Sequence, residues 1–151
     1  MKYFYIEPEV AGGLGKNTVM NRSVHPPIVS KLHYQFDGWL GDALLESFPC
    51  FIVTELAKQK LQEARLTGAT FDDVEVTTSD QFQELYPNRQ LPQFVWFRVE
   101  GEAGRDDFGI APDRRLVVSE RALEVLREFS DDCSEDWHGG RRMAGGITQD
   151  S

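Results

Sequence analysis

Residues 52–63 read IVTELAKQKLQE, and residues 117–128 read VVSERALEVLRE. Each segment begins with apolar, β-branched residues typical of a strand. A hydroxyl residue follows, Thr54 or Ser119, which can accept a hydrogen bond from an unpaired N–H group at the start of a helix. The next residue is acidic and would lie at the positive end of the helix dipole. The pattern therefore predicts two strand-to-helix junctions, each of which lays a helix on a sheet.

Apolar residues recur at helical spacing after both hydroxyl residues. They are Ala57, Leu61 and Ala64 in the first segment, and Ala122, Leu126 and Phe129 in the second. We expect one helix over residues 55–66, with Gly68 as its left-handed cap, and another over residues 120–129. The similarity is compatible with an internal repeat of two related halves and equally with chance, because any amphipathic helix that follows a strand shows part of it.

Several other runs are apolar or alternate between apolar and polar residues, as strands do. These runs are residues 2–7, 28–36, 50–53, 71–77, 94–99, 107–110 and 115–118. Residues 94–99 are apolar on both faces, which is typical of a central strand. In residues 28–36, Tyr34 and Phe36 fall on an apolar face, whereas His33 falls on a polar one.

Together these patterns predict a chain of the α+β class. Thr78, with Gln81 three residues later, fits a capping box that starts a short helix. We therefore expect a single domain over residues 1–130, with a mixed, mostly antiparallel sheet, two main helices and one short helix. Residues 131–151 contain four glycines and few apolar residues, so we expect a flexible tail there.

The composition argues against several classes of function. Forty per cent of the 151 residues are hydrophobic, and the net charge is −9. This charge disfavours direct binding of nucleic acid and favours a basic partner. We find no run of 18 apolar residues and no secretory signal, so we expect a cytoplasmic protein that does not span a membrane. In that reducing compartment Cys50 and Cys133 are expected to remain free thiols.

Residues 10–27 are expected to form a long polar connection. They include GGLGKNT at residues 12–18, which invites comparison with a phosphate-binding loop. Such a loop needs a glycine separated by four residues from its Gly-Lys pair and a hydroxyl residue directly after the lysine. Val10 and Asn17 occupy those two positions. No nucleotide cofactor is therefore predicted.

The reactive side chains show no recognisable catalytic or metal-binding pattern. His25, His33 and His138 lack metal-ligand spacing, and neither cysteine has a nearby cysteine partner, so no metal site and no cofactor are predicted. Cys50 and His33 could still meet in space as a nucleophile and its base. However, Cys50 lies between a proline and a phenylalanine in an apolar run, where cysteine usually serves as a small buried hydrophobe. No catalytic residue is predicted.

Acidic residues are concentrated in the middle of the chain. Residues 67–110 carry nine acidic and three basic residues, whereas residues 1–36 carry two acidic and four basic ones. Opposite charge across an interface accelerates association and improves specificity. We therefore expect an acidic surface that binds a basic partner protein; the alternative is an ordinary solvated face. The candidate residues are Asp72, Asp73, Glu75, Asp80, Glu84, Glu102, Asp106 and Asp107.

Five short stretches within the first 130 residues form a further set. They are YFYI at residues 3–6, EVAGG at 9–13, Trp39 with Gly41 and Asp42, IVTE at 52–55 and LVVSE at 116–120. This set resembles a family of bacterial immunity proteins, formerly described only as a domain of unknown function. Proteins of that family are encoded beside polymorphic toxins and neutralise them by binding. The resemblance provides no catalytic residues.

The resemblance implies a cytoplasmic inhibitor that covers the active site of a cognate toxin. The acidic middle of the chain suits a toxin with a basic, nuclease-like surface. Two alternatives remain open. The chain could be a small cytoplasmic enzyme that uses Cys50 or His33, or a structural or adaptor domain that assembles through its paired helices.

Overall fold

The computed structural model describes residues 2–129 and 134–137, which contain three helices and thirteen strands. The helices are α1 (Glu55–Glu63), α2 (Asp80–Leu85) and α3 (Glu120–Leu126). The strands are β1 (Tyr3–Ile6), β2 (Gly12–Leu14), β3 (Val19–Asn21), β4 (Ile28–Lys31), β5 (His33–Phe36), β6 (Leu44–Ser47), β7 (Cys50–Thr54), β8 (Ala69–Asp72), β9 (Glu75–Thr78), β10 (Phe94–Val99), β11 (Phe108–Ile110), β12 (Leu116–Ser119) and β13 (Ser134–Trp137). The α+β class predicted from the sequence is confirmed.

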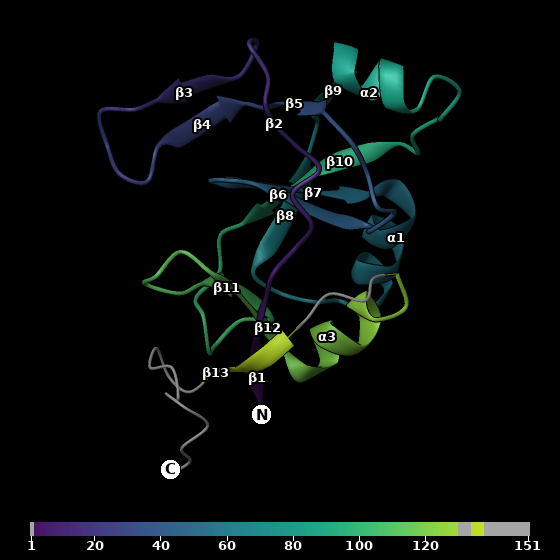
Figure 1. Ribbon diagram of the computed structural model, residues 1–151. Helices are drawn as coiled ribbons and strands as arrows, with labels where there is room; N and C mark the ends of the chain where they lie inside the picture. Colours follow the sequence, from purple (N-terminus) through teal and green to yellow (C-terminus); the bar gives the residue numbers. More distant parts are fainter. Residues whose placement is uncertain (1, 130–133, 138–151) are drawn as a thin grey trace.

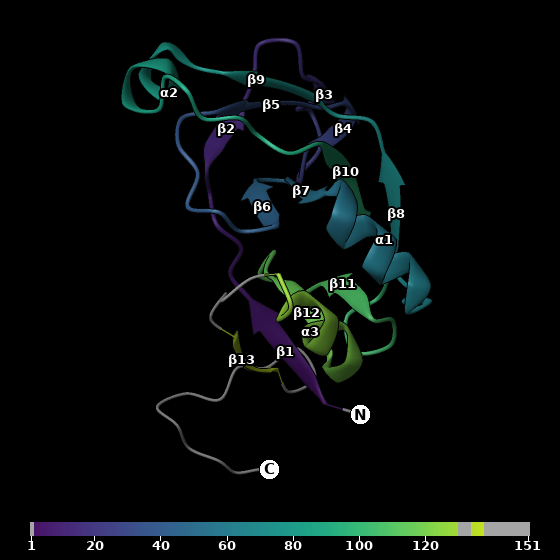
Figure 2. The same ribbon diagram turned by 90° about the vertical axis from the view of Figure 1, so that its right-hand side faces the viewer.

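The strands are divided among four sheets. Sheet A has the order β11-β12-β1-β13, sheet B has β6-β7-β10-β8, sheet C has β2-β5-β9, and sheet D is the β3-β4 hairpin. Only β5 and β9 pair in parallel among these described strands, so the mostly antiparallel character is also confirmed. Figures 1 and 2 show sheet C with α2 at the top, sheet B in the middle, and sheet A with α3 at the bottom.

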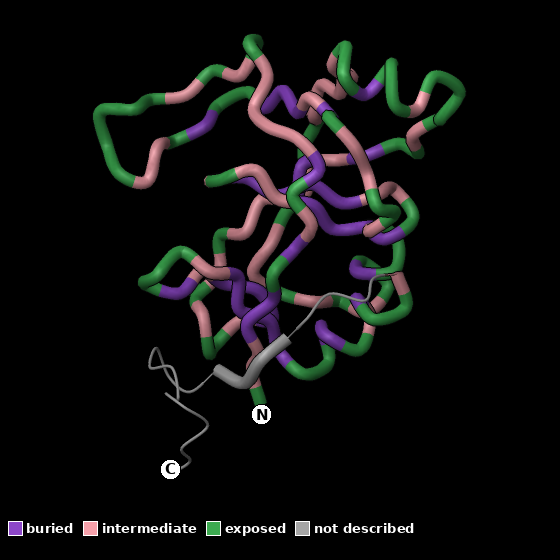
Figure 3. The backbone as a smooth tube through the Cα atoms, in the orientation of Figure 1, coloured by how far each residue is buried: buried purple, intermediate pink, exposed green. Residues whose placement is uncertain are grey.

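Sheet B is buried on both faces and separates two apolar cores (Figure 3). Side chains alternate along a strand, so Phe94 and Trp96 of β10 face one core while Val95 and Phe97 face the other. The A–B core lies between sheets A and B and includes residues of α1 and α3. The B–C core lies between sheets B and C and includes Phe82 of α2. The prediction of a central strand over residues 94–99 is confirmed.

Both predicted strand-to-helix junctions are present and share one geometry. Thr54 Oγ1 accepts a hydrogen bond from the N–H of Ala57 at 3.1 Å, and Ser119 Oγ accepts one from the N–H of Ala122 at 3.2 Å. Both capping residues have extended backbone, and both alanines are buried in the A–B core. The shared local sequence therefore specifies a shared local structure.

The helix boundaries differ from the sequence prediction by a few residues. Helix α1 ends at Glu63, because Arg65 already adopts a left-handed φ of 57° before Gly68 is reached. Helix α2 is capped by Ser79 and not by Thr78, since Ser79 Oγ accepts the hydrogen bond from Phe82 N–H at 3.2 Å. The cap therefore lies one position later than predicted, and the N–H group that it satisfies is that of Phe82 and not that of Gln81.

Three segments are more divided than the sequence predicts. Residues 28–36 form β4 and β5, and residues 71–77 contribute to β8 and β9, with each pair split between two sheets. The expected connection over residues 10–27 contains β2 and β3. A Cβ atom on Gly12 would lie 1.9 Å from the carbonyl oxygen of Gln35. Glycine is therefore needed where β2 approaches β5, and it does not mark a loop.

Part of the segment expected to be a flexible tail belongs to sheet A. Residues 134–137 form β13, which pairs antiparallel with β1, so that Ile6 lies opposite Ser134 and Tyr3 opposite Trp137. For these four residues the structure differs from the expectation. Residues 131–133 and 138–151 lie outside the described residues.

Candidate functional site

An open cleft of about 440 Å³ lies beside the hairpin of sheet D, which projects from the upper left of Figure 1. Its walls come from residues 26–29, the turn between β6 and β7, and the segment that follows β11, and strands β7 and β10 provide its floor. The lining includes the apolar residues Pro26, Ile28, Phe48, Pro49, Phe51 and Ile110 and the charged residues Glu46, Arg98, Glu100 and Arg114. A concave, largely apolar surface with a few charged groups is typical of a binding site.

Two apolar side chains at the rim of the cleft are accessible to a partner. Ile28 is 63% exposed and Phe48 is 45% exposed. The Phe48 ring also lies near the ring of His25, with 6.3 Å between their centroids. Both side chains line the cleft, so a partner that enters it would contact them.

Arg98 is held in place at the cleft by two carboxylates and one ring. Its Nη1 lies 3.1 Å from Asp72 Oδ2, and its Nε lies 3.6 Å from Glu100 Oε2. The guanidinium carbon lies 4.4 Å from the centroid of the Trp96 ring. The N–H of Asp73 and the hydrogen bond from Arg98 lower the pKa of the Asp72 carboxyl. The charges of Arg98, Asp72 and Glu100 are therefore largely satisfied within the chain.

Glu46 is a charged residue of the cleft whose surroundings disfavour its ionised form. Because side chains alternate along β6, it shares a face with Leu44 of the A–B core, and it pairs with Phe51 of β7. Among the described residues, no hydrogen bond or ion pair reaches its carboxylate. Burial, and then the nearby carboxylate of Glu7, raise the pKa of Glu46.

The eight acidic residues predicted to bind a partner fall into separate groups. Asp72 and Asp73 lie at the end of β8, Glu75 on β9, Asp80 and Glu84 on α2, and Glu102, Asp106 and Asp107 between β10 and β11. Helix α2 and strand β11 lie toward opposite ends of the molecule in both Figure 1 and Figure 2. Several of these acids already have partners: Glu75 lies 3.8 Å from Lys31 Nζ, and Glu102 lies 3.6 Å from Arg105 Nη1. The structure therefore does not bring the eight residues together in one patch.

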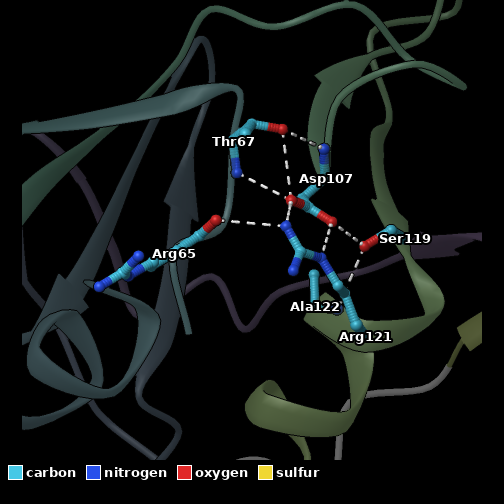
Figure 4. A network of polar contacts seen from close by, with 6 residues as sticks. All are labelled: Arg65, Thr67, Asp107, Ser119, Arg121 and Ala122. Carbon is cyan, nitrogen blue, oxygen red and sulfur yellow. Dashed lines mark hydrogen bonds and ion pairs between the residues drawn. The ribbon is translucent and has the colours of Figure 1, made fainter. Parts of the chain in front are cut away.

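Asp107 is buried and cannot contribute to an exposed acidic surface. Its carboxylate accepts hydrogen bonds from the Thr67 N–H at 2.8 Å, from Ser119 Oγ at 2.6 Å, and from Arg121 Nε and Nη2 at 2.9 and 2.7 Å (Figure 4). Burial alone would raise its pKa, but these hydrogen bonds outweigh burial and lower the pKa to about 2. Asp107 therefore joins the α1–β8 connection to the start of α3, and its role is structural.

The Cys50 and His33 pair considered from the sequence has features of structural residues. Burial raises the pKa of the Cys50 thiol to about 12, which is the reverse of what a nucleophilic cysteine requires. His33 lies on β5 and is buried. Its Nδ1 accepts a hydrogen bond from Asn17 N–H at 3.2 Å, and its Nε2 lies 2.7 Å from Thr77 Oγ1. These partners occupy both ring nitrogens.

The residues of the family resemblance also have identifiable structural roles. The Glu9 carboxylate accepts hydrogen bonds from the N–H groups of Leu40 at 2.6 Å and Asp42 at 3.3 Å. The Trp39 Nε1 donates to the carbonyl oxygen of Asp42 at 2.9 Å. The stretch beginning at Glu9 and the stretch at residues 39–42 therefore form one joined unit. These contacts give both stretches a structural role in this chain.

Sequence reasoning missed the cleft because its walls come from segments far apart in the chain. Glu46 and Phe48 lie between residues 28–36 and residues 50–53, two runs that are predicted to be strands. One usable signal was present: Phe48-Pro49 separates two apolar runs, and connections between strands run over the surface. The charge pattern indicated a binding surface in residues 67–110 instead.

Comparison with protein-family models, with curated proteins and with solved structures finds no match for this chain. None of the three described helices is long and apolar enough to cross a bilayer. Within residues 2–129 and 134–137, no three histidine, cysteine or acidic side chains converge in a way that could hold a metal ion. The cleft and the residues around it are therefore the candidate functional site.

Proposed function

We propose that this chain is a non-enzymatic immunity protein that binds and neutralises a cognate bacterial toxin in the cytoplasm. The observation that carries the proposal is the cleft, where exposed Ile28 and Phe48 border a partly buried carboxylate, Glu46, that lacks a partner among the described residues. Protein interfaces concentrate their binding energy in such places, where aromatic anchors and a few charged groups become desolvated together.

The resemblance supports the toxin as the class of partner. The stretches that carry it include the two capped junctions and the joined unit at Glu9 and Trp39. An inhibitor needs a rigid scaffold that presents a preformed surface, because little ordering entropy is then lost on binding. The exposed acids, Asp73, Asp80 and Glu84 among them, would attract a basic toxin over longer distances and raise the rate of association.

Charge introduced at the rim of the cleft is expected to abolish protection. We expect co-expression of the wild-type chain to restore growth of cells that express its cognate toxin. Ile28→Asp and Phe48→Asp should each weaken toxin binding at least tenfold and remove this protection, because a charge would be desolvated in the interface. The measurement is colony formation together with the affinity of the purified proteins.

Leu85→Asp is the matched control for Ile28→Asp, because Leu85 is 59% exposed but lies on α2, outside the cleft. It should leave growth and affinity as in the wild type. Equal thermal melting of the three variants would exclude unfolding as the cause. Full protection by Ile28→Asp and Phe48→Asp would contradict the assignment of the cleft, and no protection by the wild-type chain would contradict the immunity function.

A further inference from the structure

We infer that the cleft is built to hold an arginine or lysine side chain of the toxin, with Glu46 as the counter-ion. This inference rests on the proposed function and specifies the chemistry of the partner at the same site. It depends on the distribution of charges within the cleft, on the shape of its apolar walls, and on the cost of keeping Glu46 ionised in the free protein.

Among the described residues, Glu46 and Arg114 are the charged side chains of the cleft without an ion pair. Arg98 is neutralised by Asp72 and Glu100 at 3.1 and 3.6 Å. Arg114 is exposed and lines the same cleft, but no ion pair joins it to Glu46 among the described residues. A basic side chain from a partner would therefore meet an unpaired carboxylate.

The apolar walls suit the rest of a basic side chain. Phe48, Phe51 and Ile110 line the cleft with Glu46, and long basic side chains pack their methylene stems on such surfaces while the charged end reaches a polar group. A guanidinium also stacks favourably on an aromatic face, as Arg98 does on Trp96 in this same cleft. A volume of about 440 Å³ accommodates one long side chain with part of its backbone.

Glu46 is unfavourable for the free protein, which is expected of a binding residue. Burial and the carboxylate of Glu7 raise its pKa. The folded protein therefore binds a proton at Glu46 more tightly than the unfolded chain does. Its stability declines as the pH rises from the ordinary pKa of the carboxyl to the raised one. A cation from a partner would offset this cost in the complex. Residues that lower stability at a cleft are characteristic of functional sites.

The test uses a short peptide and the full chain, so that it does not depend on a toxin. The probe is the tripeptide acetyl-Leu-Arg-Leu-amide, titrated into the isotopically labelled protein while its amide resonances are followed by NMR. The matched probe carries citrulline, the neutral isostere of arginine. We expect the arginine peptide to shift the resonances of Glu46, Phe51 and Ile110, and the citrulline peptide to bind about tenfold more weakly, as the loss of a charged hydrogen bond implies.

Variants of the protein complete the test. Glu46→Gln should weaken binding of the arginine peptide about tenfold. Glu124→Gln, at an exposed acid of α3 outside the cleft, should bind it as the wild type does. Glu46→Gln should melt at or above the wild-type temperature, which separates lost binding from misfolding. Equal binding of both peptides, wild-type affinity in Glu46→Gln, shifts confined to residues outside the cleft, or no shift at all would overturn the inference.

The peptide experiment tests the role of Glu46, and the toxin experiment tests the immunity function. If the peptide fails to bind while the wild-type chain still protects cells, the role of Glu46 is wrong and the immunity function stands. If the peptide binds at Glu46 but the chain protects against no toxin, the cleft recognises basic side chains in some other partner and the proposed function fails.

Discussion

Asp107→Ala is expected to lower the free energy of unfolding by about 3 kcal/mol. The carboxylate is buried and accepts hydrogen bonds from Thr67, Ser119 and Arg121, so its removal leaves the Thr67 N–H without its partner and breaks the ion pair. Breaking a buried ion pair costs about 3–5 kcal/mol. The lower end applies here because the Arg121 side chain is 49% exposed and can return to water.

Urea denaturation of Asp107→Ala, Asp107→Asn and Asp73→Ala would measure this effect. Asp73 was predicted, like Asp107, to bind a partner, but it is exposed. Its replacement should therefore change the free energy of unfolding by less than about 0.5 kcal/mol. Asp107→Asn keeps the shape and loses the charge, and should be intermediate. A loss below about 1 kcal/mol in Asp107→Ala would show that the network in Figure 4 does not join the two segments.

The same carboxylate gives the wild type a characteristic pH dependence. The pKa of Asp107 is about 2 in the folded protein, below the ordinary value of 3.8. The unfolded chain therefore takes up the proton first as the pH falls, so the stabilisation is complete above about pH 4 and is lost as the pH falls toward 2. Asp107→Asn should lack this contribution to acid unfolding.

Phe36→Ala is expected to lower the free energy of unfolding by about 3–5 kcal/mol. Phe36 is fully buried in the B–C core, and its ring centroid lies 4.9 Å from that of Tyr34 and 5.2 Å from that of Phe94. Alanine would leave a cavity between sheets B and C, and the surrounding aromatic rings can relax only partly. The measurement is the midpoint of urea denaturation, with the slope of the transition as a check for two-state behaviour.

Phe48→Ala is the matched control, because it removes the same ring from a side chain that is 45% exposed. It should cost about 1 kcal/mol or less, since little apolar area returns to water. The two variants separate stability from binding: Phe36→Ala should be unstable, whereas Phe48→Ala should be stable but bind toxin more weakly. Equal stability of both variants would mean that the B–C core does not support the fold.

The parts of the fold predicted from the sequence depend on local signals. The two junctions follow from a hydroxyl cap, an acid and an apolar stripe within twelve residues, and β10 follows from an apolar run on both faces. The sequence missed β2 because Gly12 was interpreted as part of a loop, although glycine permits its approach to Gln35. It did not reveal that His33 is buried, because Asn17 and Thr77, which satisfy the ring, come from distant segments.

The candidate site was harder to predict because its residues come from segments that are far apart in the sequence. Charge along the sequence indicated residues 67–110, but charge alone does not reveal that Asp107 finds Arg121 fourteen positions later and becomes buried. The cleft requires β4, the β6–β7 turn and the segment after β11 to meet, and no local pattern in the sequence encodes that meeting. Glu46 became a candidate only through its burial and its lack of a partner among the described residues.

The proposed function requires that this chain act by binding and not by catalysis. It is tested by a titration of the purified cognate toxin with the purified chain while the activity of the toxin is measured. The proposal predicts that activity falls in proportion to added protein and reaches its minimum at one molar equivalent, and that Ile28→Asp fails to inhibit. Complete inactivation by a small fraction of an equivalent would indicate an enzyme, and undiminished toxin activity at excess protein would contradict the immunity function.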